Sequence, residues 1–227
     1  VELHSIDKWL ISRCHEIFEK YQQQMENYEM GLARQEIDKF FWNDLCDNYL
    51  EMAKERLYNP DNKYGTSQQA AQQTLATVFL EVLKMYSPFV PHITEYIYQE
   101  LYKSKLKNEL LSTSEFKELP FDEKYIEFGE AMKKVVGEVR KYKTEHNLSM
   151  KEPIAELKIS TSLDNIKCLK DSILDIQSST HAERIDVEKS DKTEVLITGR
   201  KIEDSYIEEF AQDEEKVMKL VRKDKKK

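Results

Sequence analysis

This sequence of 227 residues has few glycines, only five, and they form no glycine-rich loop. Neither a G-x-x-x-x-G-K-S/T run nor a G-x-G-x-x-G run occurs, which excludes these two kinds of phosphate-binding loop. The nucleophile elbow of many hydrolases is also missing. Because glycine is scarce and 34% of the residues are charged, the composition favours long helices over an all-β fold.

Cysteine is scarce as well. Cys14, Cys46 and Cys168 lie far apart and form no C-x-x-C pair, which argues against a zinc knuckle and against a disulfide framework. The five histidines show no metal-ligand spacing. We therefore expect no metal site, and a reducing, cytoplasmic setting.

Long apolar runs are missing too. No run approaches the ~20 residues that a membrane-spanning helix needs, and no signal peptide is recognisable, so we expect no membrane association. The first residue is Val1 rather than methionine, and we expect a piece of a longer protein. The net charge is −8, so any binding of RNA requires positive charge gathered on one face.

What the chain does have is apolar residues at three- and four-residue spacing over its first two thirds. The spacing predicts helices over residues 5–28, 32–58, 66–86 and 91–101, and a longer one over 122–146. Short links between the first four favour an antiparallel bundle. The heptad-like seam of the long helix predicts that it packs against that bundle.

After Pro153 the period changes. Strands are predicted over residues 154–161, 184–189 and 193–198, and helices over 163–174 and 202–221. The fold class is therefore mainly α, an antiparallel helical bundle followed by a small α/β appendage. We expect a bundle over 1–121, a connecting helix over 122–153 and a β-α-β-β-α domain over 154–227.

The stretch FFWNDLCDNYLEMAKERLY, residues 40–58, is the most unusual part of the chain. As a helix it would carry one buried apolar stripe and a cluster of Asn and Asp, which are mediocre helix formers. That cluster indicates a polar network or a contact surface, with a merely solvated face as the alternative. The stripe would consist of Phe41, Leu45, Tyr49 and Met52, widened by Phe40 and Trp42.

A motif within this stretch resembles the anticodon-binding helical domain of class I aminoacyl-tRNA synthetases, and within that group the valyl type. Two further runs support the resemblance, Pro88-Phe89-x-Pro91-x-Ile93-Thr94-Glu95 and Val139-Arg140-x-x-Lys143-x-Glu145. Together they span about residues 7–153. The motif consists of Phe41, Trp42, Asn43, Cys46, Asp47, Tyr49 and Glu51.

The resemblance implies a fragment that binds the anticodon stem and loop of a tRNA, expected to be tRNA-Val, beside its own catalytic domain. The H-I-G-H-like and K-M-S-K-S-like motifs of the class are absent, so we expect no catalytic residue and no cofactor in this fragment. The parent chain would ligate valine to tRNA with ATP and magnesium. Ser87 and His92 depart from the valyl pattern and keep a leucyl or isoleucyl relative open. A helical scaffold that binds no RNA is the alternative of another class.

Anticodon loops are read by stacking on aromatic or arginine planes and held by cations on phosphates. Three segments offer such side chains, with core packing as the alternative for Trp9 and solvated charge for the others. Arg140 and Lys143, one turn apart, would span adjacent phosphates, although lysine lacks the bidentate plane of the arginine that the family run carries there. The candidates are Lys8, Trp9, Arg13, Arg34, Lys39, Lys133, Arg140, Lys141 and Lys143.

Overall fold

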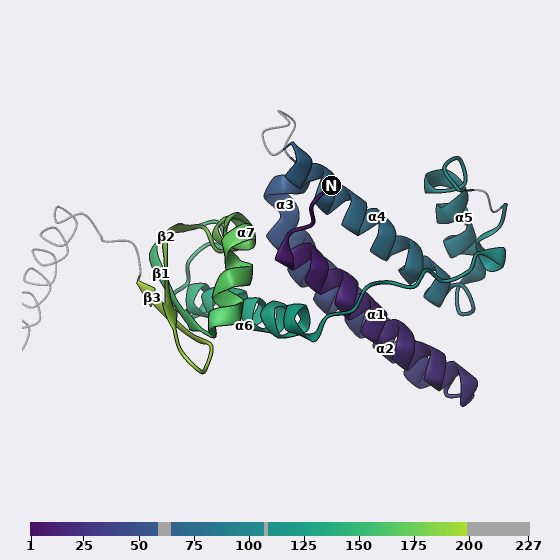
Figure 1. Ribbon diagram of the computed structural model, residues 1–227, viewed down its shortest axis with the longest axis horizontal. Coiled ribbons are helices and arrows are strands. Elements are labelled where there is room, and N and C mark those ends of the chain that lie inside the picture. Colours follow the sequence, from purple (N-terminus) through teal and green to yellow (C-terminus); the bar gives the residue numbers. More distant parts are fainter. Residues whose placement is uncertain (59–64, 107–108, 199–227) are drawn as a thin grey trace, which may run out of the picture.

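The computed structural model describes residues 1–58, 65–106 and 109–198. A helical bundle forms one end of the molecule and a small three-stranded sheet the other (Figure 1). The predicted fold class, a mainly helical bundle with a small α/β appendage, is confirmed. The predicted helix over 202–221 lies outside the described residues. No described helix is long and apolar enough to span a membrane.

The bundle begins with α1 (Ser5–Glu26) and α2 (Met30–Lys39), which lie side by side (Figure 1). Tyr28, with a φ of 60°, makes the turn between them. The helical path then continues through a π-helical segment, η1 (Phe40–Leu50), into α3 (Glu51–Leu57). The single helix predicted over 32–58 is therefore three consecutive segments.

The π-helical segment changes which side chains face the core. Phe40 and Leu45, five residues apart, are both buried, as the i→i+5 hydrogen bonding of a π-helix allows. Phe41 is only half-buried, and Trp42 is 59% exposed. The predicted stripe is confirmed at Leu45, Tyr49 and at Met52 beyond η1, and Phe41 packs partly buried against the core. Phe40, predicted only to widen the apolar face, is fully buried, and the prediction was wrong for Trp42.

Two further helices, α4 (Thr66–Tyr86) and α5 (Pro91–Leu101), complete the bundle, and a short 3-10 turn, η2 (Leu111–Thr113), follows. The long helix α6 (Glu123–Glu145) begins at Asp122, whose side chain accepts a hydrogen bond from the Lys124 N–H. It packs on α1 so closely that a Cβ added at Gly129 would lie 1.9 Å from the Trp9 ring. A glycine is therefore required at this crossing.

The α/β unit follows α6. It contains β1 (Ile154–Thr161), α7 (Leu163–Thr180), β2 (Ala182–Lys189) and β3 (Glu194–Thr198). The strand order is β2-β1-β3, with β1 parallel to β2 and antiparallel to β3. Helices α6 and α7 cover the face of the sheet toward the bundle (Figure 1).

One large apolar core runs through α1 to α4, α6 and the α/β unit, and a second, smaller cluster of Leu83, Tyr98 and Leu111 holds α5. Trp9 and Leu45 of the bundle belong to the same buried cluster as Val135 of α6 and as Ile159 and Ile176 of the α/β unit. The α/β unit is thus packed onto the bundle as a continuation of its core. The position of α7 therefore bears directly on the surface between the two parts.

Candidate nucleic-acid interface

The polar cluster of η1 is a buried ion network at Asp44. This residue is 3% exposed, and its carboxylate accepts hydrogen bonds from Arg13 Nε at 2.9 Å and Lys133 Nζ at 2.7 Å. Arg13 also pairs with Glu16, and Lys133 with Glu130. Arg13 and Lys133, two of the predicted phosphate contacts, are therefore paired with three carboxylates. The cluster joins α1, η1 and α6, and it presents no excess positive charge.

Two other predicted contacts are inaccessible. Trp9 is fully buried against α6, so it is a core residue and cannot stack on a base. Lys143 is 1% exposed, and its Nζ donates to the carbonyl oxygens of Met150 and Thr180, both at 2.9 Å. Burial lowers the pKa of Lys143. The predictions of a stacking platform at Trp9 and a phosphate contact at Lys143 are corrected accordingly.

The cations of α2 are exposed but paired. Arg34 lies 3.6 Å from Asp38, and Lys39 lies 2.9 Å from Glu36, both within one helical turn. Such exposed pairs neutralise charge locally and contribute little stability. These two positions match the solvated-charge alternative more closely than a phosphate-binding surface.

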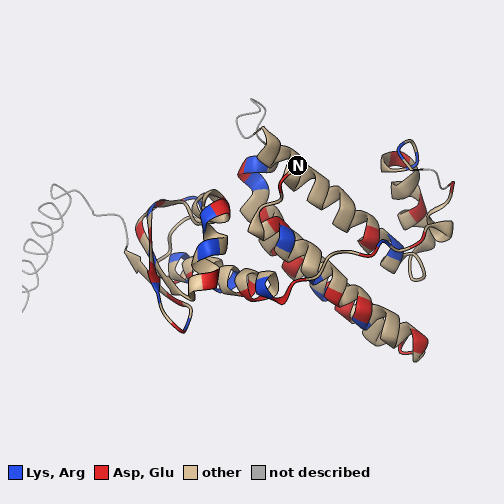
Figure 2. Cartoon of the chain, in the orientation of Figure 1, with Lys and Arg blue, Asp and Glu red and all other residues tan. Residues whose placement is uncertain are grey.

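Lys8 and Lys141 differ from the other candidates. Lys8 is half-buried with its Nζ 5.3 Å from the ring centre of Tyr125, and Lys141 is exposed. Within the described ranges, no carboxylate lies at ion-pairing distance from either lysine. Positively and negatively charged residues nevertheless occur close together along α1 and α2 (Figure 2). Positive charge on the described surface thus occurs at separate positions with acidic residues close by.

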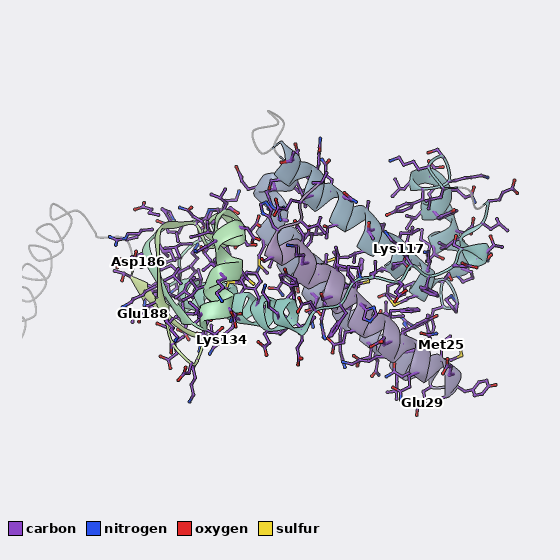
Figure 3. All side chains as sticks on the ribbon, viewed as in Figure 1. Met25, Glu29, Lys117, Lys134, Asp186 and Glu188 are labelled. Carbon is purple, nitrogen blue, oxygen red and sulfur yellow. The ribbon has the colours of Figure 1, made fainter. Side chains whose placement is uncertain are left out.

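On the outer side of the sheet, two acidic residues that the structure describes neutralise neighbouring cations. Asp186 and Glu188 lie on the side of the sheet away from the bundle (Figure 3). They pair with Arg184 and Lys158, respectively. Lys134 of α6 donates to the Thr193 carbonyl oxygen at 2.5 Å and so helps to hold the sheet. Among the residues that the structure describes, a further group of cations lies between the bundle and the sheet.

There the structure has a cleft of about 870 Å³, between η1 and α3 on one side and the C-terminal ends of α6 and α7 on the other. Its volume lies in the range of ligand-binding clefts. Sequence reasoning singled out Asp47, Glu51 and Arg140 but did not bring them together with His181, which is far away in the chain. Its polar lining includes Asp47, Glu51, Lys54, Arg140, Lys151 and His181.

Arg140 is fixed at one wall of this cleft. Its Nη2 donates to the carbonyl oxygen of Asp47 at 2.7 Å, which leaves its other N–H groups for a ligand. The Asp47 side chain is exposed beside it. Burial and the charge of Asp47 raise the pKa of the neighbouring Cys46 thiol, so Cys46 is not an activated nucleophile. This wall can bind charged or polar groups.

Cations from three elements converge on the opposite end of the cleft. Burial lowers the pKa of His181, and the charges of Lys143, Lys151 and Lys54 lower it further. The imidazole is therefore neutral at pH 7. His181 ends α7 in the left-handed conformation, with a φ of 56°. This arrangement suits an anionic ligand with a planar, unstacked group.

The sequence motif in η1 serves both the core and the cleft. Tyr49 is buried, and its hydroxyl donates to Asp7 at 2.9 Å. Cys46, Asp47 and Glu51 line the cleft. Trp42 and Asn43 are exposed. No described group of His, Cys, Asp and Glu side chains is arranged to hold a metal ion.

Comparisons with known proteins point to one family. The family model described as the anticodon-binding domain of tRNA ligase matches residues 7–159. A valine–tRNA ligase of Pyrococcus horikoshii is 36% identical over 194 residues, which cover 84% of this chain and 21% of that relative. A valine–tRNA ligase of Rickettsia canadensis is 36% identical over 197 residues, which cover 86% of this chain and 24% of that relative. The chain thus spans about a fifth of the length of these relatives.

Proposed function

Since this chain belongs to the family of tRNA-ligase anticodon-binding domains, we propose that it binds the anticodon stem and loop of a tRNA in the cleft between η1–α3 and α6–α7. The observation that carries the proposal is the convergence of Lys54, Arg140 and Lys151 from separate elements on one cleft. Lys54 also pairs with Glu51 at 3.7 Å, so Arg140 and Lys151 supply most of the uncompensated charge. Single-stranded loops offer phosphates and exposed base faces together, which matches a cleft with both cations and planar side chains.

Different side chains of the cleft bind different parts of the RNA. Arg140, Lys54 and Lys151 hold phosphates, and Lys8 and Lys141 add charge outside the cleft. His181, neutral at pH 7, offers a planar face for a base. The exposed carboxylate of Asp47 accepts hydrogen bonds from base amino groups, as carboxylates do with cytosine. Few cations take part, so the affinity depends on only a few phosphates.

We further propose that the tRNA is tRNA-Val and that the chain is part of a valine–tRNA ligase. The support is the name shared by the relatives at 31–36% identity. In such a parent, the remaining length would hold the catalytic domain that uses ATP and magnesium to join valine to the tRNA. This piece would then place the tRNA so that its acceptor end reaches that domain.

A titration tests the proposal. The chain should bind a hairpin with the tRNA-Val anticodon arm at low salt, with log affinity falling linearly against log salt concentration. Arg140→Ala should weaken binding and make the slope shallower by about 0.7–0.9, the value for one lost phosphate contact. Lys167→Ala, which removes one exposed cation from the outer side of α7, should leave both unchanged.

The opposite result favours the scaffold alternative. Net charge is −8, and a protein that only contacts other proteins should show no salt-sensitive binding to any hairpin. Binding that is equally strong with leucine or isoleucine anticodon arms would support RNA binding and contradict the tRNA-Val assignment.

A further inference from the structure

The side of α7 that faces the bundle is polar, although a continuous apolar core surrounds it. Asp171, Ser172 and Asp175 lie on this side at positions i, i+1 and i+4. Each makes a hydrogen bond or an ion pair to a helix of the bundle. Apolar packing tolerates small shifts, whereas hydrogen bonds do not, so these contacts restrict α7 to one placement.

The first of these contacts is a cap. The Ser5 N–H donates to Asp171 Oδ1 at 3.0 Å, and the Ile6 N–H donates to Ser172 Oγ at 3.1 Å. Both N–H groups belong to the first turn of α1, where a helix has no internal acceptors. The Ser5 hydroxyl also donates to Asp171, at 2.9 Å. Helix α7 thus caps α1 from across the fold.

The second contact is a buried ion network. Arg56 of α3 donates from Nε to Asp175 Oδ1 at 2.7 Å and from Nη2 to Asp7 Oδ1 at 2.8 Å. All three side chains are at most 2% exposed. One guanidinium therefore links α1, α3 and α7. Such a pair contributes little net stability when intact, but a displaced partner leaves a buried charge uncompensated.

The third contact holds the far end of α7. Lys143 of α6 donates to the carbonyl oxygens of Thr180, the last residue of α7, and of Met150. Ser178 and Ser179, directly before Thr180, and His181, directly after it, line the cleft. The middle of α7 is therefore tied to the bundle, and its C-terminal end to α6, by directional bonds.

We propose that Arg56, Asp175, Asp171 and Lys143 are positioning residues, which set the width of the cleft by fixing α7 against η1–α3. None of them has to touch RNA. The proposal rests on the proposed function for its consequence, because a fixed cleft matters only if it receives the loop. Its structural half, a fixed distance across the interface, is testable without RNA.

The test compares Asp175→Ala with Asp175→Asn. The alanine variant removes the acceptor of Arg56 Nε but leaves Arg56 paired with Asp7. The asparagine variant keeps an oxygen at that place. The matched control is Asp164→Ala, because Asp164 lies on the exposed side of the same helix and pairs only with Lys167 among the described residues.

The first measurement is the distance between spin labels at Gln73 of α4 and Lys170 of α7, two exposed positions, in a Cys46→Ser background without RNA. Asp175→Ala should broaden the distance distribution. Asp175→Asn should keep it close to that of the unsubstituted chain, and Asp164→Ala should not change it. A substitution that only lowered stability would leave the distribution of the folded molecules unchanged.

The second measurement is binding to anticodon hairpins. Asp175→Ala should lower affinity for the matching hairpin about tenfold and reduce discrimination between anticodon bases, because a smaller fraction of molecules has the cleft at the right width. A distribution as narrow as that of the unsubstituted chain, with unchanged discrimination, overturns the proposal. If no variant and not even the unsubstituted chain binds RNA, the proposed function fails, and the distance measurement still decides the placement of α7.

If Asp175→Ala does not fold, a second variant, Asp171→Ala, tests the same proposal. Asp171→Ala removes the cap on Ser5 and leaves Arg56 paired with both carboxylates, so no buried charge loses its partner. It should broaden the same distance distribution. An unchanged distribution in folded Asp171→Ala counts against the proposal as directly as one in Asp175→Ala.

Discussion

The crossing of α1 and α6 makes a sharp prediction about two glycines of the same helix. A Cβ at Gly129 would lie 1.9, 2.1 and 2.2 Å from three atoms of the Trp9 ring. Ordinary contacts of this kind begin near 3.4 Å, so the helices or the ring must move by about 1.5 Å. A Cβ at Gly137 would meet nothing within 4 Å. The same substitution should therefore have opposite effects at the two positions.

The magnitudes follow from packing and helix propensity. Alanine is better than glycine in a helix interior by about 1 kcal/mol, which Gly137→Ala should gain in full. Overpacking a filled core costs about 1–3 kcal/mol, and the upper end applies at Gly129 because Trp9 is fully buried and the overlap is large. After the propensity gain, Gly129→Ala should lose about 2 kcal/mol. The two variants should thus differ by about 3 kcal/mol.

Urea denaturation of both variants measures this difference. The midpoints should move in opposite directions with unchanged slopes, because the surface exposed on unfolding stays the same. In a Trp9→Leu background, Gly129→Ala should cost less than in the unsubstituted chain, since the two side chains are in contact. The account of this crossing is refuted if Gly129→Ala is as stable as Gly137→Ala.

Other predictions concern η1, α6 and the buried ions. Phe40→Ala should cost about 3–5 kcal/mol of unfolding free energy, while Trp42→Ala, at an exposed position, should change it by less than about 0.5, as thermal or urea unfolding will show. Burial lowers the pKa of Lys143, so the folded chain loses the ammonium proton at a lower pH than the unfolded chain does. The free energy of unfolding should therefore rise with pH between the lowered folded pKa and 10.5, the ordinary value for lysine. Lys143→Met should abolish this part of the rise, and equal slopes of stability against pH in the two proteins would contradict the prediction. Asp44→Asn should remove the carboxylate that Arg13 and Lys133 share and leave each with one partner, Glu16 or Glu130, so the salt dependence of hairpin binding should steepen. An unchanged slope would show that neither cation reaches RNA.

The sequence predicted the bundle well because burial imposes a three- and four-residue period that survives in the residue types. It did not predict the π-helical segment, since both Phe40 and Phe41 are apolar and the period alone does not show which one faces inward. The runs around Asp47 and Arg140 were enough for the family resemblance, which the comparisons confirm.

The contact residues were harder to predict than the fold. Lys143 lies four residues after the buried Val139, so its place on the inner stripe of α6 was visible in the spacing, but a buried lysine is rare. Nothing in the sequence indicated that Asp44 would take up the charges of Arg13 and Lys133. The meeting of Lys54 with His181 depends on tertiary packing alone, and no local pattern indicates it.

The cap that α7 places on α1 also has a consequence for synthesis. The bond between Ser5 and Asp171 spans 166 positions of the chain. At about 5–20 residues per second, a ribosome needs roughly 8–30 s to make that interval. Throughout it, α1 has its local cap, the hydrogen bond from the His4 N–H to Asp7, but lacks the two acceptors that α7 supplies to Ser5 and Ile6.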